Sequence, residues 1–176
     1  MIDLITELPN LKLVRPSIKR DAPASVIWLE GDEGRNTLRL MGNTDTNTQP
    51  TNLAAEQQRI SEFLDSKDQL TWTILYEDKP VGAIWVHLKS FENLPAPSIH
   101  IMLGDPKIRG KNLGTYSMQT VIKHLRSQKY DQLFSRYLLA NEGSAALLQK
   151  LGFEVLESAY KDKDGLEFQN VVLGLR

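Results

Sequence analysis

The sequence contains no cysteine. This absence excludes disulfide bonds, thiolate metal sites and a cysteine nucleophile. Histidine is scarce as well, because His87, His100 and His124 are the only three and stand far apart in the chain, so we expect no metal site. Neither sign of charge dominates, since 21 Lys and Arg residues oppose 22 Asp and Glu residues. A strongly basic surface for nucleic acid is therefore not expected.

Long apolar runs are also missing. No stretch approaches the ~20 consecutive apolar residues of a membrane-spanning helix. Residues 1–9 carry two acids and no basic residue, unlike a secretory signal. We therefore expect a cytoplasmic protein that does not bind membranes. A chain of 176 residues with 41% apolar and 24% charged residues is typical of one globular domain. We expect residues 1–176 to form it, as a monomer or homodimer.

The spacing of apolar residues predicts both strands and helices. Alternation predicts strands over residues 11–15, 70–76, 81–88, 98–103, 133–139, 155–156 and 168–173. A helical period predicts helices that begin after Asp21 and after Asn52 as N-caps, and further helices over 113–125 and 145–151. Gly31 and Gly34 predict the end of the first helix, and the polar segment 43–52 predicts a loop. This order of elements favours a mixed α/β domain.

The segment between strand 98–103 and the helix that begins at Leu113 carries the most chemical information. Gly110 and Gly114 permit close approach of the backbone to a ligand, and Arg109 and Lys111 add positive charge. The N-terminus of the following helix favours an anion. The loop is therefore suited to a pyrophosphate, although its glycine spacing matches neither the nucleoside-triphosphate loop nor the dinucleotide fingerprint. The alternative is an ordinary strand–helix connection with glycine at a tight turn.

The six residues from Arg109 to Gly114 resemble the Arg/Gln-x-x-Gly-x-Gly/Ala loop of the GNAT superfamily of acetyl-CoA-dependent N-acetyltransferases. Asn112 stands where the family usually has glycine, but asparagine tolerates a left-handed backbone better than most residues. The segment from Asn141 to Phe153 resembles the next motif of the family, with a small residue, Ser144, three positions after the asparagine and a closing Gly-Phe. The two motifs cover residues 98–153, and the earlier elements match the family by pattern alone.

The resemblance implies a mixed α/β (α+β) fold, in which helices flank a mostly antiparallel sheet of about seven strands that is splayed near the cofactor site. It also implies acetyl-CoA as the cosubstrate. The backbone of strand 98–103 would pair with the pantetheine and thioester, and an N–H group there would polarise the carbonyl. The implied cofactor-binding residues are Met102, Leu103, Arg109, Gly110, Lys111, Asn112, Leu113, Gly114, Thr115, Asn141 and Ser144.

Acetyl transfer requires a neutral amine, whereas an alkyl ammonium has a pKa of about 10.4. His100 is the candidate base, because it lies on the strand that leads into the loop and an ordinary histidine pKa is about 6.5. The alternative is a histidine that is hydrogen-bonded within a sheet. Leu148 stands where many members of the family have a tyrosine that protonates the departing thiolate. Water, Tyr137 or departure as the free thiolate are the alternatives here.

The resemblance also implies that the acceptor pocket is built from the first helices and the middle strands. Trp28, Asp32, Glu33 and Trp85 are the candidate lining residues, because carboxylates near aromatic faces suit a cationic amine. The alternative is that the tryptophans belong to the core and the acids are solvated.

The predicted function is transfer of an acetyl group from acetyl-CoA to a primary amine of a small molecule by direct attack on the thioester. An aminoglycoside-like molecule or a polyamine would be such an acceptor. One alternative is an acetyltransferase that acts on a protein N-terminus or lysine. Another is a non-catalytic module that binds acyl-CoA for regulation, which the departures at Asn112 and Leu148 would favour.

Overall fold

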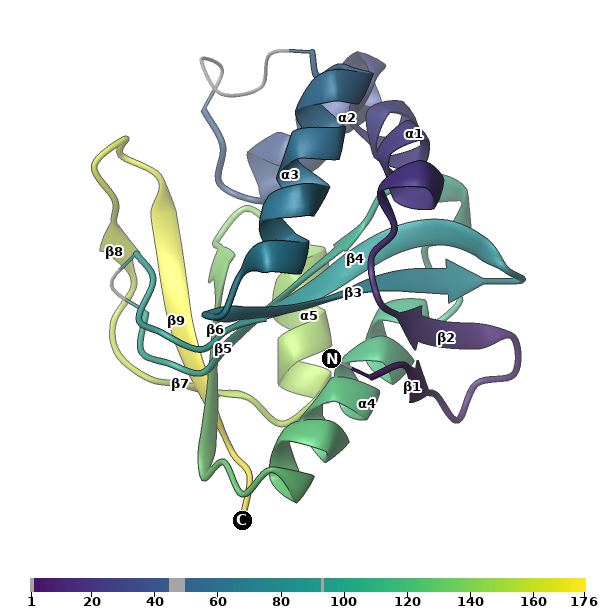
Figure 1. Ribbon diagram of the computed structural model, residues 1–176. Helices are drawn as coiled ribbons and strands as arrows, with labels where there is room; N and C mark the ends of the chain where they lie inside the picture. Colours follow the sequence, from purple (N-terminus) through teal and green to yellow (C-terminus); the bar gives the residue numbers. More distant parts are fainter. Residues whose placement is uncertain (1, 45–49, 93) are drawn as a thin grey trace.

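A β-sheet separates two groups of helices in the computed structural model, which describes residues 2–44, 50–92 and 94–176 (Figure 1). The described residues form nine strands, β1 (Leu4–Ile5), β2 (Leu11–Val14), β3 (Gln69–Tyr76), β4 (Lys79–His87), β5 (Ser98–Leu103), β6 (Gln132–Leu138), β7 (Glu154–Val155), β8 (Tyr160–Lys161) and β9 (Glu167–Gly174). The helices are α1 (Ile18–Leu29), α2 (Gly31–Leu40), α3 (Leu53–Asp65), α4 (Leu113–Ser127) and α5 (Glu142–Lys150), with a 3-10 turn at Pro106–Ile108. None of the described helices is both long and apolar enough to cross a membrane.

The strands follow the spatial order β1-β2-β3-β4-β5-β6-β9-β7, and β8 pairs with β9. Every pair is antiparallel except β5 and β6, which run parallel. These two strands are in register at a single pair, Ser98 with Phe134, within the described residues. The expected sheet, mostly antiparallel and splayed, is confirmed. It has more strands than the seven expected, because β1 and β8 are two residues long and give no alternating pattern.

The helices α1, α2 and α3 lie over one face of the sheet, and α4 and α5 lie over the other (Figure 1). The main core lies under α4, where Met118, Val121 and Leu125 pack against Trp72 and other buried strand residues. A smaller cluster under α1 and α2 joins Trp28 and Leu29 to Met102 of β5. The two faces of β5 therefore belong to different apolar clusters.

The first helical region differs from the expectation. Asp21 does not cap a helix from outside, because α1 already begins at Ile18 and the Asp21 side chain is buried within it. The helix α1 ends at Leu29, just before Gly31, as expected, but a second helix, α2, begins at Gly31 itself. A Cβ atom at Gly34 would lie 2.2 Å from the carbonyl carbon of Leu29. Gly34 is therefore required for the close approach of α2 to the end of α1.

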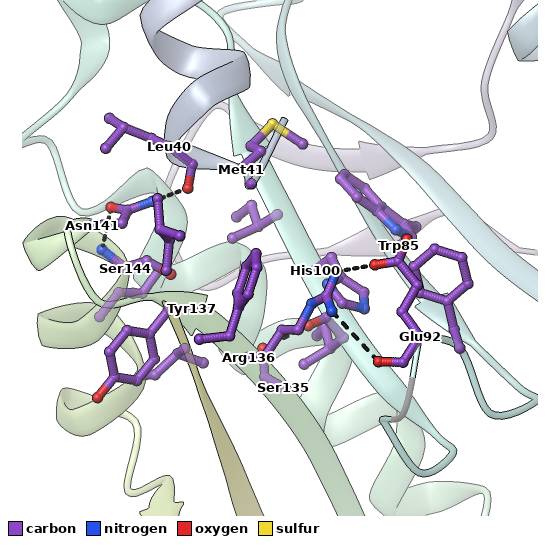
Figure 2. A pocket seen from close by; sticks show the side chains of 18 of the residues that line it. Leu40, Met41, Trp85, Glu92, His100, Ser135, Arg136, Tyr137, Asn141 and Ser144 are labelled. Carbon is purple, nitrogen blue, oxygen red and sulfur yellow. Dashed lines mark hydrogen bonds and ion pairs between the residues drawn. The ribbon is translucent and has the colours of Figure 1, made fainter. Parts of the chain in front are cut away.

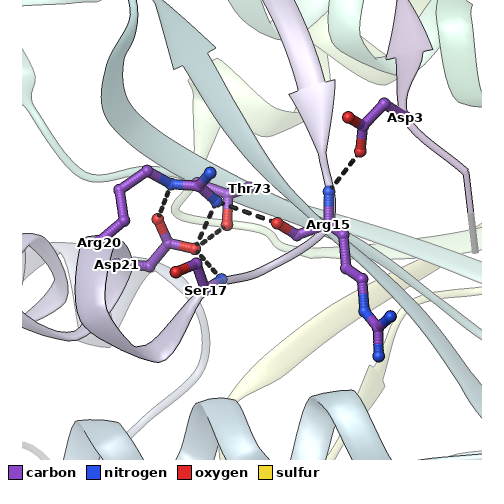
Figure 3. A network of polar contacts seen from close by, with 6 residues as sticks. All are labelled: Asp3, Arg15, Ser17, Arg20, Asp21 and Thr73. Carbon is purple, nitrogen blue, oxygen red and sulfur yellow. Dashed lines mark hydrogen bonds and ion pairs between the residues drawn. The ribbon is translucent and has the colours of Figure 1, made fainter.

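Asp21 fastens α1 to the sheet through a polar network (Figure 3). Its Oδ2 atom accepts hydrogen bonds from the Thr73 hydroxyl at 2.5 Å and from the backbone N–H of Ser17 at 2.8 Å. The Arg20 guanidinium donates to both carboxylate oxygens, at 2.5 and 2.9 Å. The carboxylate is only 4% exposed, so these partners replace the water that burial removes. The network fixes the start of α1 against β3.

The remaining helices follow the sequence pattern closely. Asn52 caps α3, because its side chain accepts a hydrogen bond from the backbone N–H of Ala55 at 3.0 Å. Gly152 has φ +85° just after α5, which is the backbone conformation that commonly ends a helix. Of the polar segment predicted as a loop over 43–52, residues 45–49 lie outside the described part of the chain.

Candidate active site

The splay between β5 and β6 leaves one edge of β5 without a strand partner. In an antiparallel pair, only every second residue turns its backbone N–H and C=O toward the neighbour. The N–H of Gly104 donates to Val81 of the β4 side at 2.9 Å, and Met102 lies opposite Ala83 in the same ladder. By this alternation Ile101 and Leu103 turn their backbone groups toward β6. The splay therefore offers free N–H and C=O groups to a ligand.

A cavity of about 270 Å³ lies at this splay (Figure 2). Its walls come from β4, β5, β6 and α5 and from the end of α2. Figure 2 shows Leu40 and Met41 on one side, Asn141 and Ser144 next to them, and Trp85, His100 and Glu92 across the cavity. The cavity thus joins segments that are more than 100 residues apart in the sequence.

His100 belongs to a cluster of rings in this cavity. Its imidazole stacks on Trp85, with centroids 5.6 Å apart and planes inclined by 19°. His87 contacts it edge-on at 5.3 Å, and Phe91 stacks on His87 at 4.4 Å. The Nε2 atom of His100 lies 3.4 Å from the Ser98 hydroxyl. The predicted base and one predicted acceptor residue, Trp85, are therefore brought together.

Burial lowers the pKa of His100 to about 3, and the charges of His87 and Arg136 act in the same direction. Burial also lowers the pKa of His87, with Arg136 contributing and Glu92 opposing the shift. Both imidazoles are therefore neutral at pH 7. The expected ordinary pKa near ~6.5 for His100 is wrong, because the sequence does not show how deeply the ring lies or which charges approach it.

Arg136 and Glu92 are two site residues that the sequence analysis missed. Arg136 comes from the middle of β6 and forms an ion pair with Glu92, a residue 44 positions away. The guanidinium also lies over the Phe168 ring, 4.5 Å from its centroid, and its Nη1 is 3.3 Å from the Tyr160 hydroxyl. An arginine in a strand with several buried residues was the available signal, since charged residues are depleted from buried strands.

The predicted anion-binding loop has the backbone that the motif requires. Gly110 and Asn112 both adopt left-handed conformations, with φ +80° and +60°. Asn112 precedes α4 without capping it through its side chain, whereas Asn52 and Asn141 do cap their helices. The first N–H groups of α4 are thus left for another partner. Lys150 of α5 adds a positive charge to this loop, since its Nζ donates to Asn112 Oδ1 at 3.0 Å. The sequence analysis did not include this residue.

The first turn of α4 packs against α5 and β5. Leu113, Gly114 and Thr115 are buried in its first turn. A Cβ atom at Gly114 would meet Leu147 at 3.4 Å and Leu103 at 3.7 Å, which are ordinary contacts or slightly tighter. Leu103 of β5 and Leu147 of α5 therefore lie beside the first turn of α4.

Two predicted cofactor residues instead hold α2 through their side chains. Arg109 donates from Nη2 to the Thr37 hydroxyl at 3.1 Å. Asn141 accepts a hydrogen bond from the N–H of Ser144 at 3.0 Å and donates to the Leu40 carbonyl at 2.9 Å. The first contact joins α2 to the loop after β5, and the second joins the end of α2 to the start of α5.

The structure does not bring the four predicted acceptor residues together. Trp28 and Glu33 line a different cavity of about 600 Å³ beside the 106–108 turn. A Cβ atom at Gly104 would lie 2.1 Å from the Trp28 ring, so this tryptophan packs against the backbone that follows β5. Asp32 is exposed and forms an ion pair with Arg35. Only Trp85 lies in the cavity at the splay. Met102 also turns away from it, toward Trp28 and Leu29.

Comparison with known proteins identifies the family. Residues 11–154 match the model of the acetyltransferase (GNAT) domain. This match covers most of the chain, so the protein belongs to the GNAT acetyltransferase family. The chain is also 28% identical over 102 residues to an uncharacterized protein of Methanocaldococcus jannaschii. That match covers 56% of this chain and 20% of the other protein, so the chain spans a small part of this relative's length.

Solved structures share the fold at low sequence identity. The microcin C7 self-immunity acetyltransferase MccE, solved with acetyl-CoA and AMP, is 15% identical with a TM-score of 0.76, over 95% of this chain and 93% of that one. RimL, an alpha-N-protein acetyltransferase of ribosomal L7/L12 solved with coenzyme A, is 15% identical with a TM-score of 0.77, over 97% of both chains. At this identity the likeness concerns the fold alone.

Proposed function

We propose that this enzyme transfers the acetyl group of acetyl-CoA to a primary amine of a small molecule. The observation that carries the proposal is the splay between β5 and β6, with a cavity on it and an uncapped helix, α4, behind it. In this reaction a bond forms between the amine nitrogen and the thioester carbonyl carbon, and the bond from that carbon to sulfur breaks. The nitrogen loses one proton and the sulfur gains one, so the products are an amide and the free thiol of coenzyme A.

The loop before α4 is the proposed site of the pyrophosphate. The left-handed residues Gly110 and Asn112 and the uncapped N–H groups of α4 fit an anion, and Lys150 adds a positive charge beside Asn112. Arg109 and Lys111 carry further positive charge in the same loop, where their side chains contact Thr37 and the Tyr76 ring. Leu103 and Ile101 offer the backbone groups that would pair with pantetheine and polarise the carbonyl. The family and the bound ligands of MccE and RimL support acetyl-CoA as the cosubstrate.

We assign His100 to hydrogen bonding with the acceptor nitrogen. Its low pKa keeps the imidazole neutral, so one of its two ring nitrogens is a hydrogen-bond acceptor. The same burial that disfavours imidazolium also disfavours an alkyl ammonium placed in this cavity. The surroundings of the amine therefore favour its neutral form, and His100 need not hold a proton before the attack.

The departing thiolate needs no strong acid, because a thiol has a pKa of about 8.5. Leu148, which stands at the position of the usual tyrosine, is buried and lines the cavity, where it cannot donate a proton. Tyr137 of β6 lines the same cavity. We propose Tyr137 as the proton donor to sulfur.

The size and charge of the cavity support a small acceptor. Among the described residues that line it, Glu92 is the one acid, and its charge is matched by Arg136. A polyamine or aminoglycoside-like molecule would find no excess of negative charge there. A small amine with few charges fits this balance better.

The experiment that tests the proposal has two stages. Thermal unfolding is measured first, with and without acetyl-CoA. At 100 times its dissociation constant the ligand should add ~2.7 kcal/mol of stability, which corresponds to a rise of roughly 5–10 °C for a domain of this size. Release of free thiol is then measured with a panel of small primary amines, and with peptides that carry a free N-terminus or a lysine.

Each result separates the alternatives. Turnover with small amines and not with peptides supports the proposal, whereas turnover with peptides alone would identify a protein acetyltransferase. Stabilisation by acetyl-CoA with no turnover on either panel would favour a regulatory module that binds acyl-CoA. No stabilisation at saturating acetyl-CoA would contradict the proposed cosubstrate site.

A further inference from the structure

Arg136 lies where two cavities meet. It lines the cavity at the splay, and it also lines a neighbouring cavity of about 430 Å³ formed with Tyr160, Lys161 and the turn 162–164. The residues common to both linings are Gly42, Asn43, Glu92 and Arg136. The guanidinium of Arg136 therefore borders both cavities.

The guanidinium of Arg136 is held in a fixed position. It lies over the Phe168 ring at 4.5 Å from the centroid, and Nη1 is 3.3 Å from the Tyr160 hydroxyl. The Arg136 side chain is 14% exposed. A planar guanidinium that is fixed by a ring on one face presents its N–H groups edge-on, which is the geometry that binds a carboxylate or a phosphate with two hydrogen bonds.

Glu92 now takes the place of such an anion. Its carboxylate pairs with Arg136, but the Glu92 side chain is 54% exposed and its backbone has φ +45°. An exposed carboxylate keeps much of its hydration and gains little from an ion pair. Arg136 is the more deeply placed partner, so another anion can replace Glu92 without leaving the guanidinium unpaired.

We propose that Arg136 binds an anionic group of the acceptor, a carboxylate or a phosphate, and that this group displaces Glu92. This inference rests on the proposed function, because it places the amine of the same acceptor beside His100. The acceptor is then an amine that carries a negative charge at its other end, as an amino acid or an aminoalkyl phosphate does.

Two features of the site agree with this substrate class. The exchange of one anion for another at Arg136 leaves the net charge of the cavity unchanged, whereas a polycation would add charge beside the guanidinium. The field of Arg136 also acts on groups at the splay, since it contributes to the lowered pKa of both His100 and His87.

The test uses pairs of amines that differ only in the anionic group. Glycine, β-alanine and 4-aminobutyrate are compared with their carboxamides, and phosphoethanolamine is compared with ethanolamine. Binding to the protein saturated with coenzyme A is measured by calorimetry, and thiol release from acetyl-CoA is measured with the same compounds. We expect at least one anionic amine to bind about tenfold or more tightly than its neutral counterpart. The carboxylate and phosphate members show which anion the site takes.

Variants then assign the preference to Arg136. Arg136→Gln should reduce the ratio between the anionic and neutral members to near one, and Glu92→Gln should strengthen binding of the anionic member several-fold by removing its competitor. Arg126→Gln is the matched control, because Arg126 is an exposed arginine of α4 that lines neither cavity. If Arg136→Gln fails to fold, the rise expected in Glu92→Gln still tests the proposal.

Several results would overturn the inference. One is equal binding of anionic and neutral amines to the wild-type protein. Another is an equal loss of affinity for anionic and neutral amines in Arg136→Gln. Equal acetylation of neutral and anionic amines would leave the proposed function intact and reject this inference alone. Conversely, binding of anionic amines that depends on Arg136 without any acetyl transfer would support the inference and contradict the proposed function. Absence of binding by every probe would also reject it.

Discussion

The imidazole of His100 stacks on the indole of Trp85, with ring centroids 5.6 Å apart. The two residues lie directly opposite each other on the paired strands β5 and β4, so the stacking follows from the register of the sheet. The contact covers one face of the imidazole and removes it from water. This explains in structural terms why His100 has so low a pKa, about 3.

The low pKa of His100 predicts a pH dependence of stability. The unfolded chain binds protons at His100 and His87 near pH 6.5, while the folded chain does not, because both pKa values are lowered. The free energy of unfolding should therefore fall as the pH decreases below about 6.5. His100→Gln should reduce the slope by up to one proton, or about 1.4 kcal/mol per pH unit, measured by chemical denaturation between pH 4 and 6. An unchanged slope would show that His100 titrates normally in the folded protein.

The same pKa makes a prediction for catalysis. The imidazole of His100 is neutral throughout the range near pH 7, so its titration should not contribute an inflection to the rate at saturating acceptor. The pH profiles of the wild-type protein and His100→Gln should therefore have the same shape in this range. We still expect His100→Gln to lower kcat, by about tenfold or more, because it removes the proposed hydrogen-bond acceptor for the amine. A neutral inflection that is lost in the variant would restore His100 as an ordinary titrating base.

Gly114→Asp tests the loop before α4. A Cβ atom at Gly114 would meet the side chains of Leu147 at 3.4 Å and Leu103 at 3.7 Å, so the carboxylate would be placed in the first turn of α4, close to the proposed pyrophosphate site. We expect affinity for coenzyme A to fall by about 100-fold or more through repulsion between like charges, and the unfolding temperature to fall as well, because the carboxylate is added at a buried position. Gly114→Ala is the matched control and should keep most of the affinity. Calorimetry that shows equal affinity in Gly114→Asp and Gly114→Ala would place the pyrophosphate elsewhere.

Asp21→Asn tests the network that holds α1. The substitution keeps the shape of the side chain but removes the charge that Arg20 and the Thr73 hydroxyl contact. We expect a loss of about 3 kcal/mol in the free energy of unfolding, because the Asp21 carboxylate is buried. Asp32→Asn removes an exposed ion pair with Arg35 and should cost less than about 1 kcal/mol. Similar losses in the two variants, by urea denaturation, would contradict the assigned role of Asp21.

Tyr137→Phe tests the proposed proton donor. It removes the hydroxyl of a residue that lines the cavity and leaves the ring in place. We expect kcat to fall by about tenfold or more with little change in the affinity for acetyl-CoA. The effect should shrink with a thioester whose thiol is more acidic, because such a leaving group needs less protonation. Equal losses with both thioesters would indicate that Tyr137 only shapes the cavity.

The sequence was most informative where the signal is local. Asn112 was expected to replace glycine because it tolerates a left-handed backbone, and its φ is +60°. Asn52 was expected to cap a helix and does so. The first helix was expected to end near Gly31 and ends at Leu29, but the helix α2 that follows was not expected, because Gly31 and Gly34 are typical of helix ends. Gly34 instead permits contact with Leu29, which depends on packing between two helices.

The candidate site was harder to predict, because its partners are distant in the chain. The contact between Arg136 and Glu92 joins residues 44 positions apart, and the contact between Asn141 and Leu40 joins residues 101 apart. Neither follows from periodicity or from a short motif. Trp28 shows the opposite error, since an aromatic residue on a predicted helix was expected at the acceptor and packs instead on Gly104.

The open edge of β5 has an evolutionary consequence. Ile101 and Leu103 present main-chain N–H and C=O groups to the splay, and every L-amino acid other than proline carries the same two groups. Substitution at these positions therefore changes the packing under α4 and leaves the polar surface of the strand intact. A site of this construction can persist while the sequence around it drifts, in keeping with chains of 15% identity that share the fold at TM-scores of 0.76 and 0.77.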